Sequence, residues 1–83
     1  MTFREFLKKR GENMSAFGRR VGELPGRKPL SPNYLSEIAA GRKLPSLTTA
    51  GDIYVATDFK VPVTYWLVLS GQLEPDPAHE ISL

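Results

Sequence analysis

Apolar residues recur at helical spacing in five short segments of the chain, and a capping residue or a glycine bounds most of these segments. The first segment spans residues 3–10, and Thr2 with Glu5 three positions later forms the pattern of a capping box. The second segment follows the N-cap candidate Asn13 and stops at Gly22. We predict a helix in each.

Three further helices follow from the same signals. Ser31 next to a proline is a strong helix start, which predicts a third helix over residues 32–40. Ser46 caps a fourth helix that runs to about residue 57, and a last apolar helix begins at residues 61–62 and ends at Leu69. The pattern predicts an all-α fold, a compact five-helix bundle.

The residues between the second and third predicted helices cannot continue either helix. Residues 23–30 contain two prolines, a glycine and the basic pair Arg27 and Lys28, which predicts an exposed loop. Residues 1–70 are expected to form one domain, and residues 71–83 an acidic, proline-containing tail. A chain of 83 residues builds only a modest core, so a second subunit would add to its stability.

Composition narrows the class of protein. The chain has no cysteine, which rules out disulfides and thiolate metal sites and favours a cytoplasmic protein. Its longest apolar run is far shorter than the roughly 20 residues that span a bilayer, so no membrane association is expected.

Charge is distributed unevenly along the chain. Residues 1–43 hold ten of the eleven basic side chains and sum to +6, whereas the remaining residues sum to −4. A basic half suits a polyanionic partner, and the alternative is an ordinary solvated helix surface.

Three stretches carry a resemblance to a known family. Residues 17–22 read FGRRVG and residues 30–47 read LSPNYLSEIAAGRKLPSL, followed at 51–67 by GDIYVATDFKVPVTYWL. These stretches resemble the lambda-repressor-like, Cro-like helix-turn-helix DNA-binding family of short phage and prophage transcriptional regulators. The resemblance implies that the third helix is a recognition helix that enters the major groove of DNA.

The chain departs from that family in two places. Thirteen positions separate Gly22 from Leu35, which lengthens the turn between the second and third helices by seven residues. Met14 stands where many relatives carry a polar residue that steadies a backbone contact.

Two glycines of the matching stretches have expected structural roles. Gly18 is expected to let the second and third helices approach closely, and Gly22 to adopt a positive φ.

The resemblance also implies which residues face DNA. The base-reading candidates are the residues of the third helix that are expected to take no part in packing: Pro32, Asn33, Tyr34, Ser36 and Glu37. Two alternatives stay open, since Glu37 could form a salt bridge or a solvated face and Tyr34 could cover the core. The phosphate-binding candidates are Asn13, Arg27, Lys28, Arg42 and Lys43.

We expect a homodimer that binds double-stranded DNA and represses transcription from a palindromic operator. Its dimer interface is predicted at Tyr65, Trp66 and Val68, which together exceed what one subunit can bury. The alternatives are that Trp66 closes the core of the monomer, or that Ile81 and Leu83 pair across subunits like a short strand.

Enzyme function is not expected. The only histidine is His79 in the predicted tail, the carboxylates are scattered, and no glycine-rich phosphate loop occurs. No metal or other cofactor is predicted. The competing hypothesis is an antitoxin-type interaction module that binds a protein partner, such as a toxin or a phage protein, through the apolar surface at residues 65–69 or through the tail, and that regulates its own operon.

Overall fold

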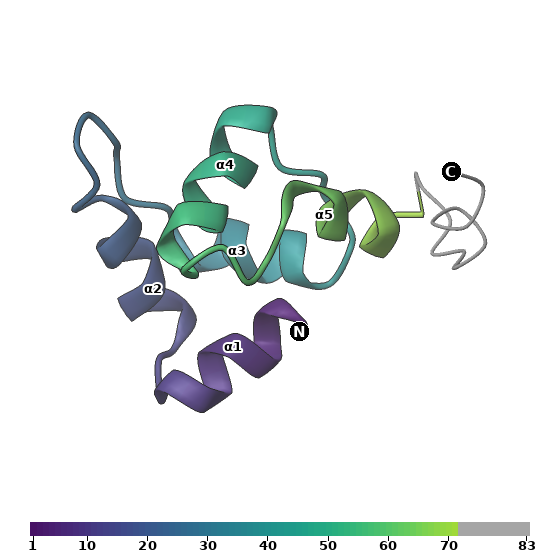
Figure 1. Cartoon of the computed structure of the whole chain (residues 1–83), viewed down its shortest axis with the longest axis horizontal. Helices are drawn as coiled ribbons and strands as arrows, with labels where there is room; N and C mark the ends of the chain where they lie inside the picture. Colours follow the sequence, from purple (N-terminus) through teal and green to yellow (C-terminus); the bar gives the residue numbers. More distant parts are fainter. Residues whose placement is uncertain (72–83) are drawn as a thin grey trace.

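The computed structural model describes residues 1–71, which form five helices (Figure 1). In chain order they are α1 (Phe3–Arg10), α2 (Met14–Val21), α3 (Pro32–Ala39), α4 (Leu47–Ala56) and α5 (Val63–Leu69). The described residues contain no strand. The predicted all-α five-helix fold is confirmed, with each helix within two residues of its expected bounds. The predictions for the tail, including His79, Ile81 and Leu83, lie outside the described residues.

Local capping explains where four of the helices begin. In α1 the hydroxyl of Thr2 accepts from the Glu5 amide at 3.0 Å, and the Glu5 carboxylate accepts from the Thr2 amide at 2.7 Å. Asn13, Ser31 and Ser46 each accept a hydrogen bond from the amide three residues ahead, at the starts of α2, α3 and α4. The capping predictions made from the sequence are thus confirmed.

The core lies where all five helices meet, and Phe3 is at its centre. The Phe3 ring packs edge-on against Phe17 of α2 and Trp66 of α5, with ring centroids 5.0 and 5.5 Å apart. The other fully buried large apolar side chains are Leu35, Ile38, Ile53, Val21 and Val61. Because α1 contributes Phe3 to this centre, the first helix is an integral part of the bundle.

Arg20 links α2 to two other parts of the chain. Its guanidinium Nε and Nη2 donate to the Glu12 carboxylate at 2.8 and 3.0 Å, and its Nη1 donates to the carbonyl oxygen of Ala56 at 2.7 Å. The hydrogen bonds from Arg20 hold the pKa of Glu12 below its ordinary value, and Glu12 in turn raises the pKa of Arg20. This contact fixes the turn before α2 against the C-terminal end of α4.

The turn between α4 and α5 is built around a buried hydroxyl. Thr57 is fully buried, and its Oγ1 donates to the Tyr54 carbonyl and accepts from the Val61 amide, at 3.1 and 3.2 Å. The next two residues, Asp58 and Phe59, adopt left-handed φ angles of 54° and 65°. These bonds set the direction in which α5 leaves the turn.

Candidate nucleic-acid interface

The α2–α3 pair forms the most extensive helix-to-helix contact of the molecule. A Cβ on Gly18 would lie 2.0 Å from the carbonyl oxygen of Leu30 and 3.4 Å from Leu35 Cδ1. The Leu30 amide also donates to the Gly18 carbonyl at 3.1 Å. The close approach predicted at Gly18 is confirmed. The part of the chain that comes closest to Gly18 is the backbone of Leu30, just before α3.

The conformation predicted for Gly22 is wrong. Its φ is −65°, in the right-handed region. Glycine is needed there for space, because a Cβ would lie 2.8 Å from the nitrogen of Pro29. The left-handed turn of this connection occurs instead at Gly26, with φ 73°.

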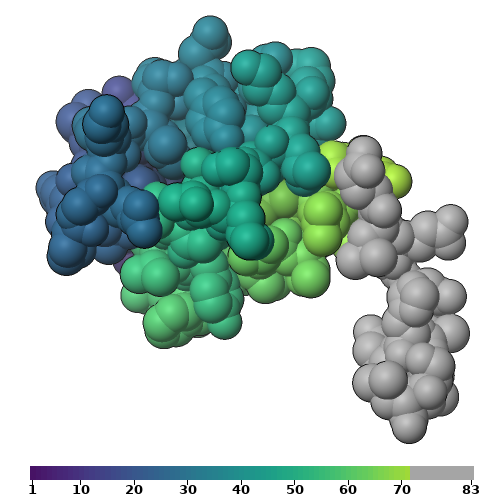
Figure 2. Space-filling model, turned by 90° about the horizontal axis from the view of Figure 1, so that it is seen from above, coloured from purple at the N-terminus to yellow at the C-terminus, as the bar shows by residue number. Residues whose placement is uncertain are grey.

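The lengthened connection, residues 22–31, is attached to the bundle along its length. Arg27 Nε lies 3.1 Å from Asp52 Oδ1 on α4, and Leu24 and Leu30 pack against the core. Figure 1 shows the connection as a loop at the end of the molecule opposite to α5, and Figure 2 shows its blue atoms bordering the green-teal surface of α4. Of the two basic residues predicted to bind phosphate here, Arg27 is therefore paired with Asp52, whereas Lys28 is exposed without an ion pair to a described residue.

The recognition-helix candidate α3 has one buried face and one accessible face. Leu35, Ile38 and Ala39 are buried, whereas Pro32 and Asn33 are exposed at its first turn. Ser36 and Glu37 are partly buried, and so is Tyr34, which packs against the core. The expectation that Tyr34 takes no part in packing is wrong, and the alternative that it covers the core describes its position.

Glu37 and Arg42 form an ion pair across the C-terminal end of α3. Arg42 Nε and Nη2 donate to the same Glu37 oxygen at 2.9 and 2.6 Å. These bonds hold the pKa of Glu37 below its ordinary value and raise that of Arg42. The resemblance implied a base contact for Glu37 and a phosphate contact for Arg42, and the alternative left open for Glu37, a salt bridge, is the one observed. The neighbouring Lys43 is exposed.

The start of α2 lies next to an exposed capping residue. The Asn13 side chain accepts from the Ala16 amide at 2.7 Å, which uses its oxygen for capping. Met14 is partly buried against the core. An additional basic residue that the sequence reading did not single out, Arg19, is exposed on α2, where its Nη1 donates to Ser15 Oγ at 3.2 Å.

The predicted dimer surface on α5 needs one correction. Trp66 is 1 % exposed and packs inside a single subunit, so the premise that one chain cannot bury it is wrong. Tyr65 and Val68 are partly buried, and the Tyr65 ring lies edge-on to Trp66 with centroids 4.8 Å apart. The alternative in which Trp66 closes the monomer core is the one observed.

No group of three His, Cys, Asp or Glu side chains in residues 1–71 is arranged to hold a metal ion. None of the five helices has both the length and the apolar character needed to cross a bilayer.

Comparison with protein-family models, curated proteins and solved structures gives no match for this chain.

Proposed function

We propose that this protein is a sequence-specific double-stranded DNA-binding transcriptional regulator, a Cro-like repressor that binds a palindromic operator as a homodimer. One observation carries the proposal. The first turn of α3 exposes Pro32 and Asn33, its opposite face is fixed in the core, and the exposed Arg42 and Lys43 follow directly after the helix. A rigid helix with an accessible polar turn beside basic residues suits insertion into the major groove.

Asn33 is the leading base-reading residue in this proposal. It is exposed, and a carboxamide can pair bidentately with the N6 and N7 edge of adenine. Glu37 can accept a hydrogen bond from cytosine N4 through Oε1, because Arg42 binds only Oε2. Arg42 can meanwhile offer its remaining nitrogen, Nη1, to a phosphate.

Phosphate contacts are proposed on both sides of α3. Lys43 lies after the helix and Lys28 in the connection before it, and both are exposed. The amides at the start of α2, next to Asn13, form a further anion site of the kind that helix N-termini provide. Arg27 contributes only if its ion pair with Asp52 opens.

A homodimer would place two α3 helices about 34 Å apart, one turn of B-DNA, on an inverted repeat. With Trp66 inside the monomer, the residues of α5 that remain candidates for the dimer interface are Tyr65 and Val68.

Selection from a random duplex-DNA pool at roughly 0.15 M salt tests the proposal, because non-specific phosphate binding is weak at that ionic strength. The expected result is an enriched inverted repeat. Asn33→Ala should relax one position of each half-site, and Lys43→Ala should weaken binding to every sequence. Lys8→Ala, an equal change of charge on α1, is the matched control and should have little effect.

A folded protein that enriches no motif would contradict DNA-reading function. Helical circular dichroism of the same sample establishes that the protein is folded. That outcome would favour the competing hypothesis of an antitoxin-type protein-interaction module. That hypothesis predicts that a protein of comparable size copurifies with this chain.

A further inference from the structure

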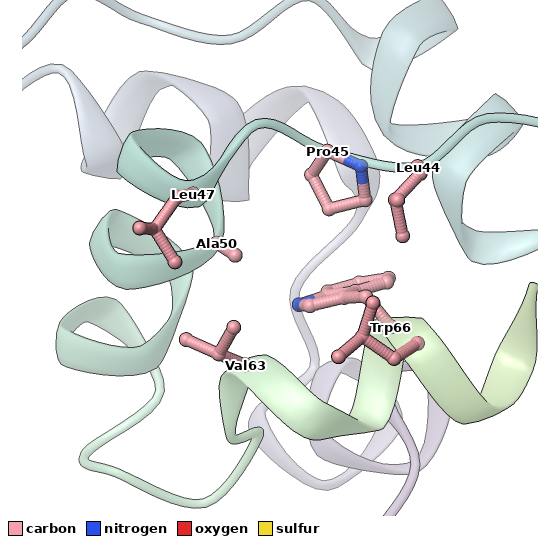
Figure 3. Close-up of a pocket in the computed structure, with 7 residues that line it drawn as sticks. Leu44, Pro45, Leu47, Ala50, Val63 and Trp66 are labelled. Atoms are coloured by element: carbon pink, nitrogen blue, oxygen red, sulfur yellow. The ribbon is translucent and has the colours of Figure 1, made fainter. Parts of the chain in front are cut away.

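An apolar groove lies between α4, α5 and the link that precedes α4. Figure 3 shows Leu47 and Ala50 on one side, Val63 and Trp66 on the other, and Leu44 with Pro45 across the top. Leu67 completes the lining, none of the seven residues is charged, and the hollow has a volume of about 210 Å³. Leu47 is 76 % exposed, the highest value among the large apolar side chains of the described residues.

A buried hydrogen-bond donor without a partner lies in the wall of the groove. Trp66 is almost fully buried, and its indole Nε1 has no acceptor within the described part of the chain. In Figure 3 this nitrogen faces the space enclosed by Ala50, Val63 and Pro45. Buried indole N–H groups usually have a partner. The groove therefore suits an occupant that brings apolar side chains and a carbonyl oxygen.

The volume indicates what kind of occupant fits. Small-molecule pockets measure about 300–1,000 Å³, and this hollow is smaller. One or two aliphatic side chains of a peptide segment match it better, with the main chain supplying the carbonyl.

The course of the chain places such a segment nearby. The end of α5 packs on the link before α4, since a Cβ on Gly41 would lie 3.0 Å from the Leu69 carbonyl oxygen. Gly71 has a left-handed φ of 83°, and its amide donates to the Val68 carbonyl at 3.1 Å, a geometry that turns the chain out of the helix. Residues 72–83 follow directly. Twelve residues reach up to about 40 Å, whereas α5 is only about 10 Å long.

Charge and apolar spacing in that segment match the surface beside the groove. Glu74, Asp76 and Glu80 are acidic, and the link before α4 carries Arg42 and Lys43. Ile81 and Leu83 follow at the end, and the groove follows the two basic residues along the link. Acidic and then apolar residues in the segment thus match basic and then apolar residues along the link.

We propose that residues 72–83 dock on their own subunit. The acidic residues lie along Arg42 and Lys43, the side chains of Ile81 and Leu83 enter the groove, and a main-chain carbonyl accepts from Trp66 Nε1. The groove is a site for the C-terminal segment, and this inference does not depend on DNA binding.

A nitroxide on residue 79 tests the docking in the full chain. Because the chain has no cysteine, His79→Cys gives a single labelling site. The amide signals of Ala50 and Val63 should lose more than half of their intensity by paramagnetic relaxation, and Ala16 on α2 should keep its intensity. Adding Ile81→Ser and Leu83→Ser should restore the groove signals. No selective loss in the labelled parent, or loss that survives the two serines, overturns the proposal.

A mixing experiment distinguishes docking within one subunit from docking on a second copy of the chain. Spin-labelled protein without ¹⁵N is combined with unlabelled ¹⁵N protein, so that only contacts between copies broaden signals. The docking within one subunit predicts no broadening in the mixture, and broadening there would assign the groove to a second copy. The indole N–H signal of Trp66, the single tryptophan, should also shift when residues 72–83 are removed. An unchanged signal would contradict the proposed hydrogen bond.

Discussion

Gly18 and Gly51 both lie inside helices, but only Gly18 has atoms where a Cβ would go. A Cβ at Gly18 meets the Leu30 carbonyl at 2.0 Å, whereas at Gly51 nothing lies within 4 Å. Gly18→Ala should therefore lower the free energy of unfolding by about 3 kcal/mol, through overpacking and loss of the Leu30 hydrogen bond. Gly51→Ala should raise it by roughly 0.5–1 kcal/mol, since alanine favours the helix. Urea unfolding followed by circular dichroism measures the free energy of unfolding of both variants. Equal effects would contradict the close contact between Gly18 and Leu30.

The Glu12 carboxylate makes stability depend on pH. Its pKa is lowered in the folded protein by Arg20, so its contribution to stability is present above the unfolded pKa of about 4.3. That contribution is lost as the pH falls through the lower folded pKa, because Glu12 is then protonated. Glu12→Gln should thus destabilise the protein at pH 7 and have progressively less effect below pH 4.

Urea unfolding of the parent and of Glu12→Gln across this pH range checks that convergence. The other carboxylates titrate equally in both proteins and cancel in the difference. A difference that stays constant down to low pH would mean that the charge on Glu12 contributes nothing.

At the scale of the elements, the ion pair at the end of α3 limits the positive charge available to DNA. Glu37 holds Arg42 through two hydrogen bonds to one oxygen. Glu37→Gln should release Arg42 for phosphate, which strengthens binding to non-specific duplex DNA and steepens its salt dependence by about 0.9 in the log–log slope.

Fluorescence anisotropy titrations between low and moderate salt measure that slope. Glu23→Gln, the same change of charge in the connection before α3, is the matched control. If both variants shift affinity equally, the effect comes from net charge and not from the release of Arg42.

Helix positions were predictable because their signals are local. Caps such as Thr2 and Ser31, and the apolar repeats that follow them, lie within a few residues of each other. The attachments between elements were not predictable in the same way. Arg27 pairs with Asp52 and Arg20 reaches the Ala56 carbonyl, and many acceptors of equal chemistry exist along the chain. Only the folded arrangement selects among them.

The candidate site was predictable in part for a related reason. The pattern placed Asn33 on the exposed side of α3, where the structure has it. The pattern also kept Tyr34 among the base-reading candidates, although Tyr34 packs against the core. An aromatic ring at a half-exposed position can pack sideways onto a core that the sequence does not locate. Hydropathy alone could not tell whether Trp66 faces inward or outward, since α5 is apolar on most of its surface.

At the scale of the whole molecule, a single buried ring connects three helices. Phe3 contacts Phe17 and Trp66, and a domain of this size is stable by only about 0.05–0.15 kcal/mol per residue. Phe3→Ala should cost about 3–5 kcal/mol and leave little net stability. Phe59→Ala, at a side chain 63 % exposed, should cost less than about 1 kcal/mol and serves as the control.

Thermal and urea unfolding of these two variants decide whether α1 is part of one cooperative unit. A Phe3→Ala variant that loses only the signal of α1, with the remaining helices unfolding as in the parent, would contradict that view.

The anchored ends of the connection between α2 and α3 have a consequence for engineering. Gly22 lies against Pro29 and Gly18 against Leu30, so the two ends of residues 23–28 are held close together by the bundle. Gly26 stands in between with open space around it. New sequence inserted after Gly26, or new termini opened there by circular permutation, would leave both anchors intact. The connection is thereby a natural place to graft a reporter or a second binding module onto this small scaffold.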